Sequence, residues 1–228
     1  MNIGWSQPEK RRSLVDHNHD HDEHAPIEDA TEMSHYEKRT RAIQSLLVEK
    51  GVMAADEVRR QVENMDSRTP AQGTRVIARA WVDEAFKARL LANANAAIGE
   101  LRIEAGSDPV IAAVENTREV HNVIVCTLCS CYPRALLGFP PAWYKSLNYR
   151  SRMVEEPRAV LGEFGLELDE EVEVRVYDST ADMRYLVIPE RPPGTEQMGE
   201  EELADLVTRD SMIGVAVAHG PDLKTSHA

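Results

Sequence analysis

The three cysteines of the chain, Cys126, Cys129 and Cys131, all lie within one six-residue segment. Thiolates at this spacing converge on one point only if the backbone curls around it. A thiolate is a soft ligand that prefers transition metals to magnesium or calcium. Because the three are so close together, none can staple distant loops, and the chain is not a disulfide framework of the secreted type. The spacing therefore indicates a three-thiolate metal site and leaves the metal open.

Two other kinds of site use cysteines at similar spacing. A Cys-x-x-Cys pair can form a disulfide, although the third thiol argues against that interpretation. Iron–sulfur clusters and structural zinc sites generally need about four protein ligands. His121, on the preceding predicted strand, is a candidate fourth ligand, but a lone histidine in a strand is more often a packing residue. From the residues alone, a structural zinc or redox module without catalytic activity stays an alternative.

The segments that must position the cysteines are a mixture of strands and helices. β-Branched or alternating stretches predict strands at residues 110–114, 120–125, 171–177 and 184–188. Helices are predicted at residues 56–66, 75–95, 149–156, 157–164 and 200–208. The prolines after the cysteines predict an irregular stretch there. This order predicts the α+β fold class, with a layered α/β/β/α core behind an N-terminal helical arm.

The chain is expected to divide into four parts. Residues 1–33 carry a His- and Asp-rich stretch without hydrophobic periodicity, which predicts a disordered tail. Residues 34–97 predict a helical arm, with Asp83 placed to cap a helix midway; the arm either wraps a partner or packs on its own domain. The metal-binding α+β core is expected at 98–217, and a flexible C-terminal tail at 218–228.

Charge and hydropathy exclude two kinds of partner. The formal net charge is −13, which repels phosphate backbones, so no nucleic acid is expected to bind. No apolar run approaches the roughly 20 residues that span a bilayer, and the first residues lack the apolar segment of a signal peptide. We therefore expect a cytoplasmic protein with no membrane partner.

The residues around and after the cysteines resemble the α subunit of nitrile hydratases. The resemblance is carried by the motif VCTLCSC at residues 125–131 and by the downstream segments GFPPAWYK at 138–145, YRSR at 149–152, EVRVYD at 173–178, RPPGTE at 191–196 and LVTRDS at 206–211. It covers residues 35 to 217. Residues 126–131 are called the claw below.

The resemblance implies an enzyme that hydrates a nitrile to the amide at one low-spin cobalt(III) per chain, with iron(III) as the alternative. It implies that Cys126, Cys129 and Cys131 bind the metal through sulfur, and that the backbone amides of Ser130 and Cys131 bind it through nitrogen. It also implies that Cys129 is oxidised to a sulfinic acid and Cys131 to a sulfenic acid, which makes both catalytic. The attacking oxygen comes from a metal hydroxide or from the sulfenate. Thr127 favours cobalt, because iron members tend to have serine there.

The resemblance implies partners as well. A nitrile hydratase β subunit, as one or two chains, would supply arginines to the oxidised sulfurs. An activator protein that delivers the metal would be a further partner, and the substrate would be a small nitrile. The metal subunit of thiocyanate hydrolase carries the same claw and is the alternative function.

Two positions depart from the family's pattern and are candidate substrate-pocket residues. Ser107 stands where many members have glutamine, and Arg134 stands where tryptophan is more frequent. We predict a substrate larger or more polar than a simple aliphatic nitrile, such as a heterocyclic one, unless Arg134 faces solvent or a partner's carboxylate. Trp143 is a third pocket candidate, with the alternative that it anchors the loop in the core.

Overall fold

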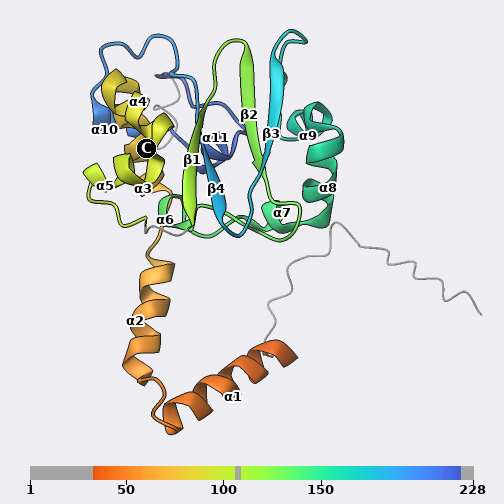
Figure 1. Cartoon of the computed structure of the whole chain (residues 1–228). Helices are drawn as coiled ribbons and strands as arrows, with labels where there is room; N and C mark the ends of the chain where they lie inside the picture. Colours follow the sequence, from red (N-terminus) through yellow and green to blue (C-terminus); the bar gives the residue numbers. More distant parts are fainter. Residues whose placement is uncertain (1–32, 106–108, 222–228) are drawn as a thin grey trace, which may run out of the picture. The chain divides into compact units, whose positions relative to one another are not determined.

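The computed structural model describes residues 33–105 and 109–221 (Figure 1). Residues 1–32 of the predicted tail, the candidate Ser107, and residues 222–228 lie outside the described residues. The chain forms two compact units, Met1–Ala54 and Ala55–Ala228. The described part of the first unit holds α1 (His35–Glu49). The second unit holds α2 (Ala55–Asp66), α3 (Ala71–Val82), α4 (Glu84–Ala92), α5 (Ala94–Glu100), β1 (Val110–Glu115), β2 (Val120–Val125), α6 (Arg134–Leu137), α7 (Ala142–Lys145), α8 (Leu147–Glu155), α9 (Pro157–Glu163), β3 (Glu173–Asp178), β4 (Met183–Ile188), α10 (Glu200–Ala204) and α11 (Arg209–Ile213).

Helix α1 begins at a capping box. The Ser34 hydroxyl accepts from the Glu37 backbone N–H, and the Glu37 carboxylate accepts from the Ser34 backbone N–H. None of its residues is buried. The apolar side chains of Ile43 and Leu46 are exposed. The helix therefore carries apolar surface that the described residues leave uncovered.

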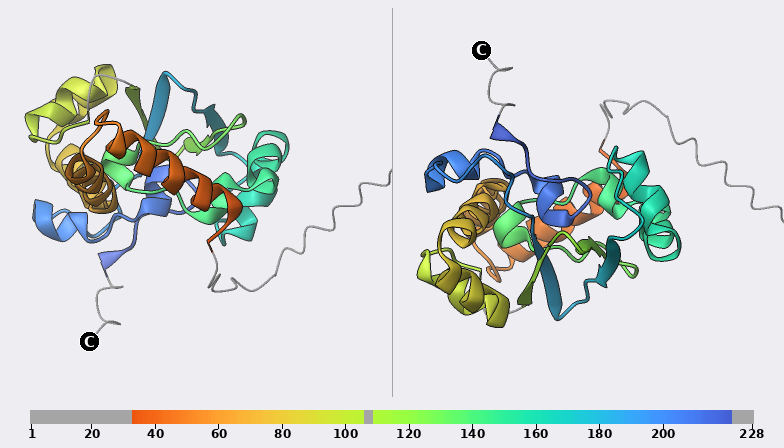
Figure 2. Two further views of the ribbon diagram at one scale, coloured as in Figure 1. Left: turned by 90° about the horizontal axis from the view of Figure 1, so that it is seen from below. Right: turned by 90° about the horizontal axis from the view of Figure 1, so that it is seen from above.

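Two pairs of parallel strands form the centre of the second unit. Strand β1 pairs with β4, and β2 pairs with β3. In the second pair Val125 lies opposite Asp178, so both strands end at the same level. Helices α4 and α5 pack beside β1, and α8 and α9 pack beside β2 and β3, so that helices flank the strands on both sides (Figure 1, Figure 2). The predicted α+β fold class is confirmed.

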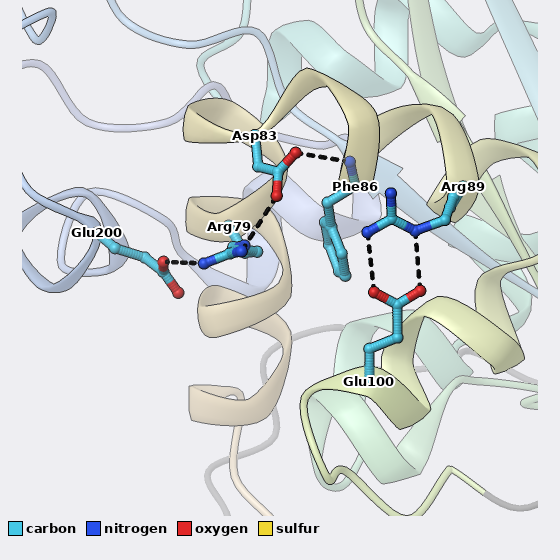
Figure 3. Close-up of polar contacts among 6 residues, drawn as sticks. All are labelled: Arg79, Asp83, Phe86, Arg89, Glu100 and Glu200. Carbon is cyan, nitrogen blue, oxygen red and sulfur yellow. Dashed lines mark hydrogen bonds and ion pairs between the residues drawn. The ribbon is translucent and has the colours of Figure 1, made fainter.

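Residues 75–95, predicted as one helix, form two. Helix α3 ends before Asp83, whose carboxylate accepts from the Phe86 backbone N–H at 2.9 Å and begins α4. This hydrogen bond holds the pKa of Asp83 below its usual value. Arg79 of α3 pairs with Asp83 and with Glu200 of α10, as Figure 3 shows. Within the predicted arm, α2 to α5 thus belong to the second unit, and α3 to α5 bury apolar residues in its core.

The sequence prediction was wrong on the shorter helices. The proline-containing stretch after the cysteines, predicted to be irregular, holds α6 and α7, which have four residues each. The helix predicted at 200–208 ends at Ala204, and a separate helix, α11, begins after the cap residue Thr208. Helices this short contain about one turn and give no usable periodicity. No helix in the described ranges is both long and apolar enough to cross a membrane.

Candidate metal centre

The three cysteine sulfurs converge at the carboxyl end of β2. The Cys126 and Cys129 Sγ atoms are 3.6 Å apart, and those of Cys129 and Cys131 are 3.1 Å apart. All three sulfurs lie within 4.8 Å of one another. These separations exceed the roughly 2.05 Å of a disulfide, and all three thiols are free. Cys126 and Cys131 are buried and Cys129 is exposed. The chain therefore curls around one point, as the spacing predicted.

Two charged residues from distant elements hold the claw. Asp178, at the end of β3, accepts from the Thr127 backbone N–H at 2.9 Å and from the Thr127 hydroxyl at 2.5 Å. Arg150 of α8 donates from Nε to the Cys126 carbonyl at 3.0 Å and from Nη2 to the Thr127 carbonyl at 2.6 Å. The backbone at the start of the claw is thus held from both sides. Sequence reasoning missed both contacts; the only signal for Asp178 was its place at the end of a predicted strand.

An aromatic cluster supports the claw from the core. The Tyr144 hydroxyl donates to the Cys131 carbonyl at 2.8 Å, and the Tyr149 hydroxyl donates to the Ile124 carbonyl at 2.7 Å. Trp143 packs edge-on against the rings of Tyr149 and Phe164, at centroid distances of 4.9 and 4.8 Å. The structure places Trp143 in this cluster, among residues that anchor the loop after the claw.

Burial and hydrogen bonding make the thiols of Cys129 and Cys131 chemically different. Burial raises the pKa of the Cys131 thiol to about 12. The Cys131 thiol donates to Cys129 and lowers the pKa of the Cys129 thiol. The backbone N–H groups of Ser130 and Cys131 act on Cys129 in the same direction. In the metal-free claw, the exposed Cys129 sulfur therefore takes negative charge before the Cys131 sulfur does.

The donor set of the claw fits a thiophilic transition metal. Three sulfurs face one point, and the amides of Ser130 and Cys131 are directed at the middle sulfur. No histidine or carboxylate joins the group among the residues the structure describes, and this excludes the hard oxygen environment that magnesium and calcium prefer. The side chains therefore suit a transition metal that prefers sulfur ligands, such as cobalt, iron or zinc.

A cavity of about 420 Å³ opens beside the claw. Cys129, Ser130 and Cys131 form part of its wall. Arg134 lines it, together with two arginines that sequence reasoning did not single out, Arg68 and Arg184. Trp143 is not among the residues that line it in the described part of the chain. The structure thus places Arg134 beside the claw and packs the half-buried Trp143 against the core.

Comparison with known proteins decides the family. The sequence model of the family described as nitrile hydratase, alpha chain, matches residues 34–216. The chain belongs to this family. The low-molecular weight cobalt-containing nitrile hydratase subunit alpha of Rhodococcus rhodochrous is 46% identical over 201 residues, which are 87% of this chain and 97% of that protein. The cobalt-containing nitrile hydratase subunit alpha of Pseudonocardia thermophila is 48% identical over 182 residues, or 79% of this chain and 89% of that one.

Solved structures of nitrile hydratases and of a related hydrolase have the same fold. A variant of the Fe-type nitrile hydratase of Comamonas testosteroni Ni1 superposes with a TM-score of 0.76 at 41% identity, and the match covers 82% of this chain and 91% of that one. A recombinant thiocyanate hydrolase comprising partially modified cobalt centres gives 0.78 at 38% identity, with the same coverage. The resemblance drawn from the claw and the segments after it is therefore confirmed.

Proposed function

We propose that this chain is the metal-bearing α subunit of a nitrile hydratase, a lyase that adds water to a C≡N bond to give the amide. The observation that carries the proposal is the claw itself: three free thiols within 4.8 Å of one another, in a chain that belongs to the nitrile hydratase α-chain family. Relatives at 46 and 48% identity are named as cobalt-containing, which supports cobalt as the metal here.

The claw residues would hold cobalt(III) through the three sulfurs of Cys126, Cys129 and Cys131 and through the backbone nitrogens of Ser130 and Cys131. When bound, the metal supplies a Lewis acid that polarises a nitrile or lowers the pKa of water. The chain's own part is to hold the ligands in place. Thr127 is fixed through its backbone and its hydroxyl, and the Tyr144 hydroxyl fixes the Cys131 carbonyl.

Oxidation of Cys129 to the sulfinic acid and of Cys131 to the sulfenic acid fits the position of both residues in the cavity wall. The oxygen atoms added to these sulfurs would face the space that the substrate enters. Arg184 lines the same cavity, and its charge acts on the Cys131 thiol by lowering the pKa. It is one positive group of this chain beside the sulfurs, to which a β subunit would add others.

A β subunit is the partner that the proposal requires, with a metal-delivering activator as a further one. The exposed apolar residues of α1, including Ile43 and Leu46, support a partner, because an amphipathic helix needs a surface on which to bury its apolar side. The three free, closely spaced thiols fit a reducing compartment, so we also propose a cytoplasmic location.

The test is to produce the chain together with its β subunit in cobalt medium, and then to measure the metal content, the mass of the tryptic peptide that contains the claw, and amide formation from a nitrile. We expect about one cobalt per chain, and a peptide mass raised by two oxygens on Cys129 and one on Cys131. The Cys131→Ser variant should lose both cobalt and activity. Zinc bound to unoxidised cysteines would contradict the proposal.

A further inference from the structure

The charged side chains that line the cavity beside the claw are all positive among the described residues. Three arginines line it, Arg68, Arg134 and Arg184, and none of the other lining residues that the structure describes is acidic. The remaining wall is formed by the claw and by small or apolar residues such as Pro109 and Ile111. The formal net charge of the chain is −13, yet every charged side chain among the described lining residues is a guanidinium.

These guanidinium groups are not neutralised within the described part of the chain. Arg68 donates to the Asn64 amide oxygen at 3.1 Å, and Arg184 donates to the Met183 carbonyl at 3.2 Å. The Arg134 guanidinium lies over the Phe139 ring, 5.5 Å from its centroid. No described carboxylate forms an ion pair with any of the three.

Several other arginines of the second unit are paired with carboxylates, whereas Arg150 and Arg158 donate to backbone carbonyls. Arg79, Arg89, Arg152 and Arg175 each form an ion pair with a glutamate at 3.4 Å or less. Carboxylates thus pair with arginines elsewhere, but none of the described carboxylates lines the cavity. A guanidinium has five N–H donors, so these arginines keep most of theirs for a ligand.

Two of these arginines, Arg68 and Arg134, come from segments that pack closely against each other. Gly138, which ends α6, lies so close to the segment before α3 that an added Cβ would be 2.4 Å from the Arg68 carbonyl oxygen. Arg68 and Arg134 also line one small recess, together with Phe139. Both side chains therefore start from fixed backbone positions and reach the same space.

We infer that this cavity selects a nitrile that also carries a carboxylate, which Arg134 and Arg68 bind while the nitrile end reaches the claw. The inference rests on the proposed hydratase function and names its substrate class. A guanidinium presents parallel N–H donors that match the two oxygens of a carboxylate. A cavity of about 420 Å³ suits a small ligand of this kind. The bonds made and broken are those of the hydration itself: water adds to C≡N, and the carboxylate is unchanged.

The experiment uses the cobalt-loaded complex with the β subunit and two matched substrates, 3-cyanopropanoate and its neutral amide, 3-cyanopropanamide. We expect kcat/KM to be at least about tenfold higher for the anion, the difference that one charge-assisted hydrogen bond provides. In Arg134→Gln this preference should fall about tenfold, mainly through KM for the anion. Arg134→Lys keeps the charge without the two parallel donors and should retain part of the preference.

A matched control and a binding measurement distinguish a loss of carboxylate recognition from a general loss of enzyme activity. Arg118 is 88% exposed and lies outside this cavity, so Arg118→Gln should leave the preference unchanged. Calorimetry with succinamate, the carboxylate-bearing product, should give a binding signal that weakens about tenfold in Arg134→Gln and falls with added salt.

The possible failures are distinguishable. Equal turnover of both nitriles, or a preference for the neutral one, would overturn the inference and leave the hydratase function standing. Hydration of neither nitrile would overturn the proposed function. Hydrolysis of thiocyanate in preference to both nitriles would overturn the carboxylate-bearing nitrile as substrate and favour the chemistry of the thiocyanate hydrolase relatives.

Discussion

The contact between Thr127 and Asp178 leads to a prediction about metal loading. Asp178 accepts two hydrogen bonds from Thr127, at 2.9 Å from the backbone N–H and at 2.5 Å from the hydroxyl. In Asp178→Asn one oxygen still accepts, but the other is replaced by an NH₂ group that faces a donor. One hydrogen bond and the negative charge are therefore lost.

The size of the effect follows from the type of bond and its exposure. A hydrogen bond to a charged group contributes about 1.5–3 kcal/mol when it is shielded from water. Asp178 is exposed, which reduces the expected loss to about 1–2 kcal/mol, because water competes for both partners. If this free energy is what keeps the claw in its metal-binding conformation, its loss lowers the apparent affinity for cobalt by a factor of about 5–30.

The assay is cobalt content per chain in the purified complex, after expression at a series of limiting cobalt concentrations, together with urea unfolding of each variant. Asp182→Asn is the matched control, because Asp182 lies in the turn directly after β3 and its side chain makes no hydrogen bond or ion pair with the described residues. An Asp178→Asn complex that loads cobalt as readily as wild type would refute the reasoning that this contact positions the claw.

Three further predictions concern the core and the thiols. Gly214→Ala should lower the free energy of unfolding by at least about 2 kcal/mol, because φ is +93° and an added Cβ would lie 2.0 Å from the Asn122 carbonyl oxygen; Gly51→Ala, at φ +67° in open space, should cost less in the same urea titration. Burial lowers the pKa of His121, so folding favours the neutral ring. Stability is therefore full above the unfolded pKa of about 6.5 and falls below it by up to about 1.4 kcal/mol per pH unit, and His121→Gln should show a smaller decline between pH 7 and 5. In the metal-free protein, iodoacetamide should modify the exposed Cys129 first, as peptide mass spectrometry would show; earlier labelling of a buried cysteine would contradict this.

The sequence was most informative where the interacting groups are neighbours in the chain. The three thiols of the claw lie within six residues, so their spacing alone predicted convergence. Asp83 was recognised as a cap because its partner, the Phe86 N–H, is three residues away. The strand at residues 120–125 was predicted with its observed bounds, because a run of β-branched residues marks a buried strand.

The contacts that hold the site were not predictable in this way. The Thr127–Asp178 contact joins residues 51 positions apart and depends on the register of two parallel strands, which no local pattern encodes. The Arg150 contacts with the claw backbone depend on how α8 packs against β2. The charge of the cavity is also a tertiary property, because Arg68, Arg134 and Arg184 come from three separate segments.

The pairing of β2 with β3 also fixes when the claw can mature during synthesis. The cysteines leave the ribosome well before Asp178, so the contacts of Thr127 with that carboxylate are absent from the nascent chain until β3 has been made and paired. Closing a loop of this length costs entropy that only the finished sheet offsets. An unfinished chain therefore presents three loosely tethered thiols, open to any soft metal or oxidant. Delivery of cobalt after the strands have paired would protect the thiols from capture by the wrong ion.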